Sequence, residues 1–249
     1  MAIKFFKLKK HNLHDFYYGF KQGIPIALGY IPVSFTFGLM AVGGGIPVWM
    51  AIFISLSNLT SAGQFAGTKL IIADAPLLEI ALTTFVINIR YMLMSLSLSQ
   101  RITSKMPIVK RCVMAFGITD ETFTVASLEK REITFAYMMG LITCPYWGWG
   151  LGTALGALTS SILPQRLQSS MGIALYAMFI ALIVPAAKKS KAALTVSAIA
   201  ISISSFFTWM PYMAEVSEGW SIIIATIVAS CAGALLFPVE EDEYEYEYE

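Results

Sequence analysis

The chain has 249 residues, of which 57% are hydrophobic and only 13% are charged. Soluble domains usually carry about 25% charged residues, so this composition excludes an ordinary water-facing globular protein. The net charge is +1. The basic residues are scattered among short loops, which excludes the continuous basic surface of a nucleic-acid-binding protein.

The apolar residues occur in long blocks that predict transmembrane helices. A helix that crosses a hydrocarbon core of ~30 Å needs about 20 mostly apolar residues, and the chain has room for about seven. Exposed sheet edges are not tolerated in lipid, and the alternating pattern of a membrane barrel is absent. We therefore predict an all-α integral membrane protein, a polytopic bundle of about seven transmembrane helices with broken or re-entrant segments. The predicted spans are 16–45, 47–73, 76–99, 133–162, 171–187, 192–210 and 220–238, and a weaker apolar stretch covers 109–128.

The first span, 16–45, is predicted to be irregular. Pro25 and Pro32 each remove a backbone donor and clash with the preceding turn, and Gly29 lies between them. Broken helices persist at membrane depth only where protein or a wet cavity satisfies the freed backbone groups, as in transporters. The alternative, which stays open, is a proline-kinked helix whose glycines allow tight packing.

The second span, 47–73, contains a polar stripe near its middle. The stripe consists of Ser57, Thr60, Ser61 and Gln64. Their spacing of i, i+3, i+4 and i+7 places them on one face of a helix. Such a face bonds to neighbouring helices or lines a cavity that a solute enters, and we take all four as candidate substrate-binding residues.

The third span, 76–99, carries Asn88 and Arg90 at its centre. A charged side chain at the bilayer centre costs at least ~2.5–3.5 kcal/mol, and it usually faces the bundle interior with a partner. The guanidinium of Arg90 fits a carboxylate bidentately. That carboxylate belongs either to an internal acid or to a substrate, so both residues are candidate substrate-binding residues.

The weaker stretch, 109–128, contains Thr119, Asp120 and Glu121 between apolar flanks. Desolvation and like charge both favour the protonated form of a carboxylate pair, which suits coupling to protons. The alternative is a helix N-terminus at the membrane surface, capped by Thr119, with the acids favoured by the helix dipole. We take these three residues as candidate coupling residues.

The span 133–162 contains Gly148, Gly152 and Gly156. Small residues at four-residue spacing let a neighbouring helix approach closely. We therefore predict a tight helix–helix contact along this face.

The loop charges predict an orientation, because Lys and Arg in short loops favour the cytoplasm. The basic segment 1–15, the loop 188–191 and the acidic tail 239–249, which is expected to be disordered, are predicted to be cytoplasmic, on either side of a transmembrane domain covering 16–238. The basic loop 101–111 should also lie inside, yet three full spans would place it outside. Either 16–45 is re-entrant, or 109–128 is an eighth crossing at which the charge rule fails.

Four motifs are more specific together than any one alone. They are residues 25–32 (PIALGYIP) leading to Phe37-Gly38, residues 62–65 (AGQF), residues 88–91 (NIRY) and residues 119–123 (TDETF). Their order and spacing resemble the AzlC family, the large subunit of two-component branched-chain amino acid exporters in bacteria and archaea. The resemblance covers roughly residues 19–236; the polar run 58–61 and the Glu/Tyr tail depart from the family pattern.

The resemblance implies a secondary, ion- or proton-driven exporter of branched-chain amino acids in the cytoplasmic membrane of a prokaryote. It also implies a small AzlD-type membrane partner, and a homo-oligomer is left open. It places recurring polar positions at Gln64, Asn88, Arg90, Thr119, Asp120 and Glu121.

Other function classes are weighed against this one. No GxxxxGK[ST] motif is present for ATP, no hydrolase motif is present, and no cofactor, metal or nucleic acid is expected, so we do not expect an enzyme. A passive channel and a non-transporting structural subunit of a transport complex are the alternatives. A channel would favour rings of like residues from identical subunits.

Overall fold

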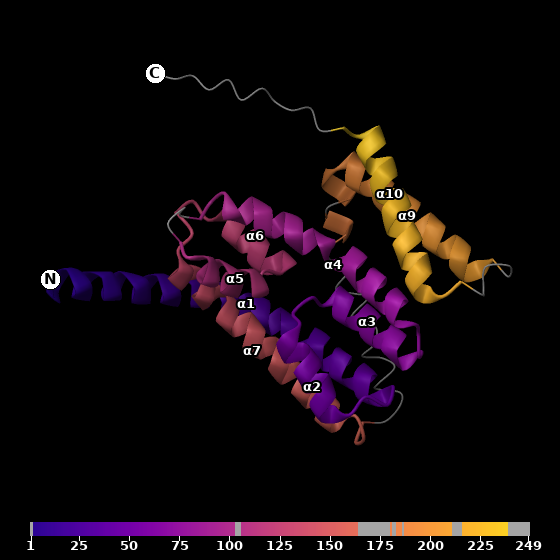
Figure 1. Ribbon diagram of the computed structural model, residues 1–249, viewed down its shortest axis with the longest axis horizontal. Coiled ribbons are helices and arrows are strands. Elements are labelled where there is room, and N and C mark those ends of the chain that lie inside the picture. Colours follow the sequence, from indigo (N-terminus) through magenta and orange to yellow (C-terminus); the bar gives the residue numbers. More distant parts are fainter. Residues whose placement is uncertain are drawn as a thin grey trace. The chain divides into compact units, whose positions relative to one another are not determined.

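The computed structural model describes residues 2–102, 106–163, 180, 183–185, 187–210 and 216–238. This described part is helical and contains no strand, as predicted, apart from an isolated bridge between Ile102 and Ile133. The chain divides into two compact units, Met1–Met178 and Phe179–Glu249, which are treated separately (Figure 1). The helices of the first unit are α1 (Ala2–Gly43), α2 (Val48–Ser57), α3 (Ala62–Ile72), α4 (Leu77–Ser99), α5 (Ile108–Phe116), α6 (Asp120–Leu128) and α7 (Phe135–Thr159), and those of the second are α9 (Lys191–Trp209) and α10 (Glu218–Leu236).

Four of the described helices are long and apolar enough to cross a membrane. They are Asn12–Gly43 within α1, α4, α9 and α10, so the predicted number of about seven spans is not confirmed. The 25-residue α7 carries no charged residue but is outside this group. The predicted span 171–187 and the tail 239–249 lie largely or wholly outside the described residues.

Helices α1 and α7 form a parallel pair that is the frame of the first unit (Figure 1). A Cβ added at Gly19 would collide with the backbone of Tyr137, and one added at Gly156 would collide with the backbone of Phe35. At the start of α7, Thr134 donates a hydrogen bond to Asp15 of α1 over 2.9 Å. The close contact predicted for the glycines of 133–162 is confirmed.

Helix α1 runs without interruption through Pro25, Gly29 and Pro32. The prediction of a broken helix at these three residues is therefore wrong, and the proline-containing continuous helix is observed. The physical reason is the contact with α7, since Gly148 packs on Ala27 and Gly152 packs on Ile31. Backbone-level packing between the two prolines holds the helix together where its own hydrogen bonds are lost.

The segment 47–73 is a hairpin of two helices, where the sequence predicted one continuous span. Helix α2 ends at Ser57, the chain turns through residues 58–61, and α3 begins at Ala62. Helix α3 then runs back until Ile72 covers Gly44, just before the start of α2. The hairpin therefore begins and ends at one end of the frame, which we call the Gly44 end.

The turn of this hairpin has a local cause. The side chain of Asn58 accepts a hydrogen bond from the backbone N–H of Thr60 over 3.0 Å, and a side-chain bond of this kind competes with helix formation. Ser61 then adopts a positive φ of 45°, which an α-helix does not allow.

The segment 108–128 is a second hairpin, and it enters from the opposite end. Helix α5 starts where the Lys110 ammonium lies over the ring of Phe135, at 5.2 Å from its centroid. After a turn at residues 117–119, α6 returns until Arg101 donates to the carbonyls of Ser127 and Glu129. We call this the Arg101 end. Neither a re-entrant 16–45 nor an eighth crossing by 109–128 is observed.

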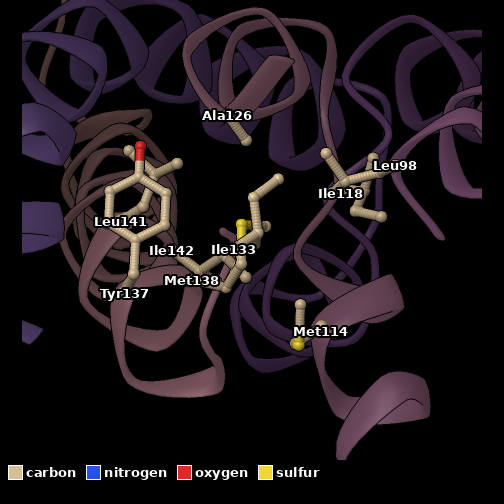
Figure 2. Close-up of a cluster of buried hydrophobic side chains, with 9 residues drawn as sticks. All are labelled: Leu98, Met114, Ile118, Ala126, Ile133, Tyr137, Met138, Leu141 and Ile142. Atoms are coloured by element: carbon tan, nitrogen blue, oxygen red, sulfur yellow. The ribbon is translucent and has the colours of Figure 1, made fainter. Parts of the chain in front are cut away.

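A buried apolar cluster fixes the second hairpin between α4 and α7 (Figure 2). It combines side chains of α4, α5, α6 and α7 with those of the connecting segments, so each arm of the hairpin packs on a long helix. Its members are Leu98, Met114, Ile118, Ala126, Ile133, Tyr137, Met138, Leu141 and Ile142.

Candidate functional site

The turns of the two hairpins meet near the middle of the long helices. We call residues 58–61 the α2–α3 tip and residues 117–119 the α5–α6 tip. Tyr146, near the middle of α7, contacts both hairpins. Its hydroxyl donates to the carbonyl of Leu56 over 3.1 Å, and its ring packs edge-on against Phe116 at 6.1 Å. Both tips therefore lie at the same depth in the bundle.

Arg90 of α4 lies between the two tips. Its Nη2 is 2.9 Å from Oδ2 of Asp120, the first residue of α6, and 3.2 Å from the hydroxyl of Tyr91. Within the described part of the chain, its buried Nε has no hydrogen-bond partner. The arginine is thus paired with an internal acid and keeps a free donor.

Tyr91 connects α4 to the α2–α3 tip. Its hydroxyl donates to the carbonyl oxygen of Thr60 over 3.2 Å. Because the same hydroxyl accepts from Arg90, the tip, the tyrosine and the arginine form one hydrogen-bonded chain.

Tyr30 connects α1 to the α5–α6 tip in a similar way. Its hydroxyl lies 2.7 Å from Oγ1 of Thr119 and 2.5 Å from Oε2 of Glu121. Thr119 also caps α6, since its Oγ1 accepts from the backbone N–H of Thr122 and the Thr122 hydroxyl accepts from the backbone N–H of Thr119. The predicted cap is confirmed. The N-terminus of α6, however, lies beside the middle of α4 and not at either end of the bundle.

Two carboxylates therefore occupy the first turn of α6, where the helix dipole stabilises negative charge by roughly 0.3–1 kcal/mol per group in exposed positions. Asp120 is paired with Arg90, and Glu121 with Tyr30. The three candidate coupling residues and Arg90 thus form one cluster, although their roles stay predictions.

Gln64 belongs to a different, fully buried network. Its Nε2 donates to Ser55 over 2.6 Å, and its Oε1 accepts from the indole of Trp149 over 3.0 Å. Ser55 in turn lies 2.7 Å from Thr153. Both ends of the amide are engaged within the protein, so Gln64 joins α3 to α2 and α7 in this structure.

The predicted polar face of Ser57, Thr60, Ser61 and Gln64 does not exist, because the helix ends after Ser57. Ser57 is exposed and bonds back to Phe53 within α2. Thr60 and Ser61 lie in the α2–α3 tip. Of the four residues, Thr60 is linked to Arg90, through the hydroxyl of Tyr91.

Two further polar atoms at the α2–α3 tip are unsatisfied. Asn88 packs against Gly63, at the start of α3. Its buried Oδ1 and the buried Oγ of Ser61 have no hydrogen-bond partner among the described residues. Most buried polar side-chain atoms are hydrogen-bonded, so unsatisfied ones need an explanation such as water or a ligand.

Sequence reasoning missed Tyr30, Tyr91, Ser55 and Trp149 as members of these networks. The available signal was the polar tip of a buried tyrosine or tryptophan, which usually finds a partner. Both tyrosines stand inside motifs that the sequence analysis quoted, but nothing in the spacing marked them as contacts of the hairpin tips.

Known proteins are similar in sequence to the part of the chain that contains these residues. The AzlC protein family model matches residues 25–163, which include both hairpins. The inner membrane protein YgaZ of Escherichia coli K12 is 28% identical over 225 residues, which cover 88% of this chain and 89% of that protein. An uncharacterized membrane protein of Archaeoglobus fulgidus is 31% identical over 188 residues, which cover 75% of this chain and 82% of that protein. No solved structure matches.

Proposed function

This chain belongs to the AzlC family of membrane proteins, and on that premise we propose that it is a secondary transporter subunit that exports branched-chain or similar apolar amino acids. The membrane location agrees with the names of its relatives, which are membrane proteins, and with the four long apolar helices among the described residues. The chain has no P-loop motif, so we propose that an ion or proton gradient drives transport.

One observation carries the proposal, the pairing of Arg90 with Asp120 between two hairpin tips at mid-depth. A charge at this depth is expensive and usually functional. An amino acid carries a carboxylate and an ammonium group, so its binding site needs a cationic and an anionic contact. Arg90 offers the first and Asp120 offers the second when they separate.

The unsatisfied atoms fit this use of the site. The Nε of Arg90 is a free donor, and an arginine can bind a carboxylate through two parallel N–H donors. We propose that a substrate carboxylate replaces Asp120 as the partner of Arg90, and that Asp120 then contacts the substrate ammonium. Glu121, bonded to Tyr30, stays available to exchange a proton.

The partner is part of the proposal. We propose that the chain acts in the cytoplasmic membrane together with a small AzlD-type membrane subunit, and not as an enzyme.

Counterflow in proteoliposomes tests the function. Vesicles preloaded with unlabelled leucine, with and without a co-expressed small membrane subunit, are offered labelled leucine, lysine or citrate. We expect saturable accumulation of leucine alone, and its loss in Arg90→Gln. Leucine counterflow that is unchanged in a correctly inserted Arg90→Gln variant would contradict the carboxylate role. Linear, non-saturable flux would favour the passive channel instead.

A further inference from the structure

We propose, resting on the transport function above, that the two hairpins are separate gates, each latched by one tyrosine hydroxyl. Tyr91 latches the α2–α3 hairpin and Tyr30 latches the α5–α6 hairpin. The two gates close the Arg90 site towards opposite ends of the bundle, so that opening either latch exposes the site to one side only.

The opposite entry of the hairpins follows from their neighbours. Helix α2 runs antiparallel to α7, with Leu56 beside Gly150 and Ser55 beside Thr153. Helix α5 runs parallel to α7, with Lys110 beside Phe135 at its start and Phe116 beside Tyr146 at its end. Because α2 and α5 run in opposite directions along α7, the two hairpins enter from opposite ends of the bundle and both reach its middle.

Each tyrosine reaches a tip from a long helix. Tyr91 belongs to α4 and donates to the Thr60 carbonyl in one tip. Tyr30 belongs to α1, is 6% exposed, and contacts Thr119 in the other tip. The hydroxyl of each therefore ties the movable end of a hairpin to a helix that crosses the bundle.

Arg90 is placed to connect the two latches. Its Nη2 contacts the hydroxyl of Tyr91, which holds the first tip, and the carboxylate of Asp120, which begins α6 behind the second tip. A substrate carboxylate that draws Arg90 away changes the surroundings of both tips at once. This is the link between binding and gating that alternating access requires.

The rest of the unit favours movement of the hairpins over movement of the frame. Helices α1 and α7 touch at backbone level through their glycines. The α2–α3 hairpin, by contrast, is flanked by two left-handed residues, Gly45 with φ 94° and Asp74 with φ 57°. Hinges are a few connecting residues that absorb a change in backbone dihedrals, and these two stand at both ends of this hairpin.

The re-entrant path is tested first, by labelling without substrate. In a background in which the three native cysteines are replaced, single cysteines Pro47→Cys, Ala73→Cys and Lys130→Cys are treated with a membrane-impermeant maleimide in vesicles of each orientation. We expect positions 47 and 73 to label from one side and position 130 from the other. Labelling of position 73 from the same side as position 130 would show a crossing and overturn the proposal, without bearing on leucine counterflow.

The latches are tested with a crossed pair of variants. Leu59→Cys and Ile118→Cys report on the two tips, because both residues are buried, at 6% and 7% exposure. Tyr91→Phe should raise the labelling rate of Leu59→Cys only, and only from the side of position 47. Tyr30→Phe should raise that of Ile118→Cys only, from the side of position 130. We expect about a fivefold rise, the change in equilibrium that corresponds to one hydrogen bond.

Each tyrosine variant is the control for the other, since both remove one hydroxyl oxygen, from the buried ring of Tyr30 and from the half-buried ring of Tyr91. Equal increases at both tips, increases from the same side, or no increase would overturn the separate latches. In any of these cases, leucine counterflow that still depends on Arg90 would leave the proposed function standing. If the cysteines label as expected but counterflow no longer distinguishes leucine from lysine and citrate, the result would count against the proposed function.

Discussion

Arg90 has more hydrogen-bonding capacity than its observed partners use. Its Nη2 serves both Asp120 and Tyr91, while its Nε remains without a partner within the described residues. A guanidinium has five donors in a fixed fork, so an incoming carboxylate can be bound before Asp120 is fully released. Under the proposed function, the geometry of the fork, and not only its charge, is therefore expected to matter for substrate binding.

Arg90→Lys tests that geometry. Lysine keeps the charge but cannot form two parallel N–H bonds. Loss of one charge-assisted hydrogen bond costs about 1.5–3 kcal/mol, so we expect the half-saturating leucine concentration to rise roughly 10- to 100-fold. Initial rates of counterflow at a series of leucine concentrations measure this half-saturating concentration. Arg131→Lys is the control and should transport normally, because the half-exposed Arg131 side chain pairs with Glu129 at the Arg101 end. An equal effect of both variants would argue against a special role for the fork.

Gln64→Leu tests the buried network of α2, α3 and α7. The variant leaves Ser55 and Trp149 without their amide partner, and hydrogen bonds between membrane helices contribute about 0.6 kcal/mol on average, with a maximum of about 1.7. We expect a lower melting temperature in detergent, measured by tryptophan fluorescence. Ser57→Ala, which removes a bond within one exposed helix turn, should leave the melting temperature unchanged. A lower melting temperature for Ser57→Ala than for Gln64→Leu would show that the network does not stabilise the hairpin.

Single residues were predicted well where their chemistry was unusual for their surroundings. The sequence analysis selected Arg90 and Asp120 because charges in apolar runs need partners, and the structure pairs them. The polar face built on Ser57 and Gln64 was wrong, because it assumed one helix across a segment that turns. Periodicity gives positions on a face only when the helix continues. Here the bond from the Thr60 backbone N–H to Asn58 and the positive φ of Ser61 end it.

At the scale of elements, the two hairpins remove the conflict between charge and crossing number. One of the two alternatives left open by the sequence was a re-entrant 16–45, where prolines and glycines are concentrated. Packing on α7 overrides the prolines, whereas 47–73 turns back without any proline inside its helices. With a returning α2–α3 hairpin, Arg101 lies at the same end as the start of α1, which is the end that the positive-inside rule assigns to the cytoplasm.

The α1–α7 contact predicts opposite effects for two glycines. A Cβ at Gly152 would collide with the Ile31 backbone, whereas a Cβ at Gly29 would have no atom within 4 Å. We expect Gly152→Val to abolish the folded, monodisperse protein in size-exclusion chromatography. Gly29→Ala should fold and gain stability, because alanine is favoured over glycine inside a helix by about 1 kcal/mol.

The matched pair also separates two explanations of the helix. If α1 were broken at the prolines, Gly29→Ala would disturb the break and lower the melting temperature. Normal folding of Gly152→Val would mean that the two helices do not touch at backbone level.

At the scale of the whole molecule, the proposed function predicts that net transport depends on a proton. Glu121 is bonded to Tyr30, outside the Arg90–Asp120 pair. We expect Glu121→Gln to keep leucine counterflow, which needs no net proton movement, but to lose leucine accumulation driven by an imposed pH gradient. Paired uptake assays in the same vesicles measure both. Retained gradient-driven accumulation would show that Glu121 is not the coupling residue.

Glu129→Gln provides the control for this prediction. This residue lies at the Arg101 end, where it pairs with Arg131 away from the tips. It should keep both counterflow and gradient-driven accumulation. Equal loss in the two variants would indicate a general effect of removing a carboxylate.

The parallel contact of α1 and α7 has a consequence for how the protein is made. Facing residues of the two helices are about 120 positions apart in the chain. At a synthesis rate of about 5–20 residues per second, α1 leaves the ribosome roughly 6–24 seconds before its partner exists. Its glycine face must stay covered by lipid or by the insertion machinery during that interval, so the frame that supports both hairpins is the last contact of the unit to be completed.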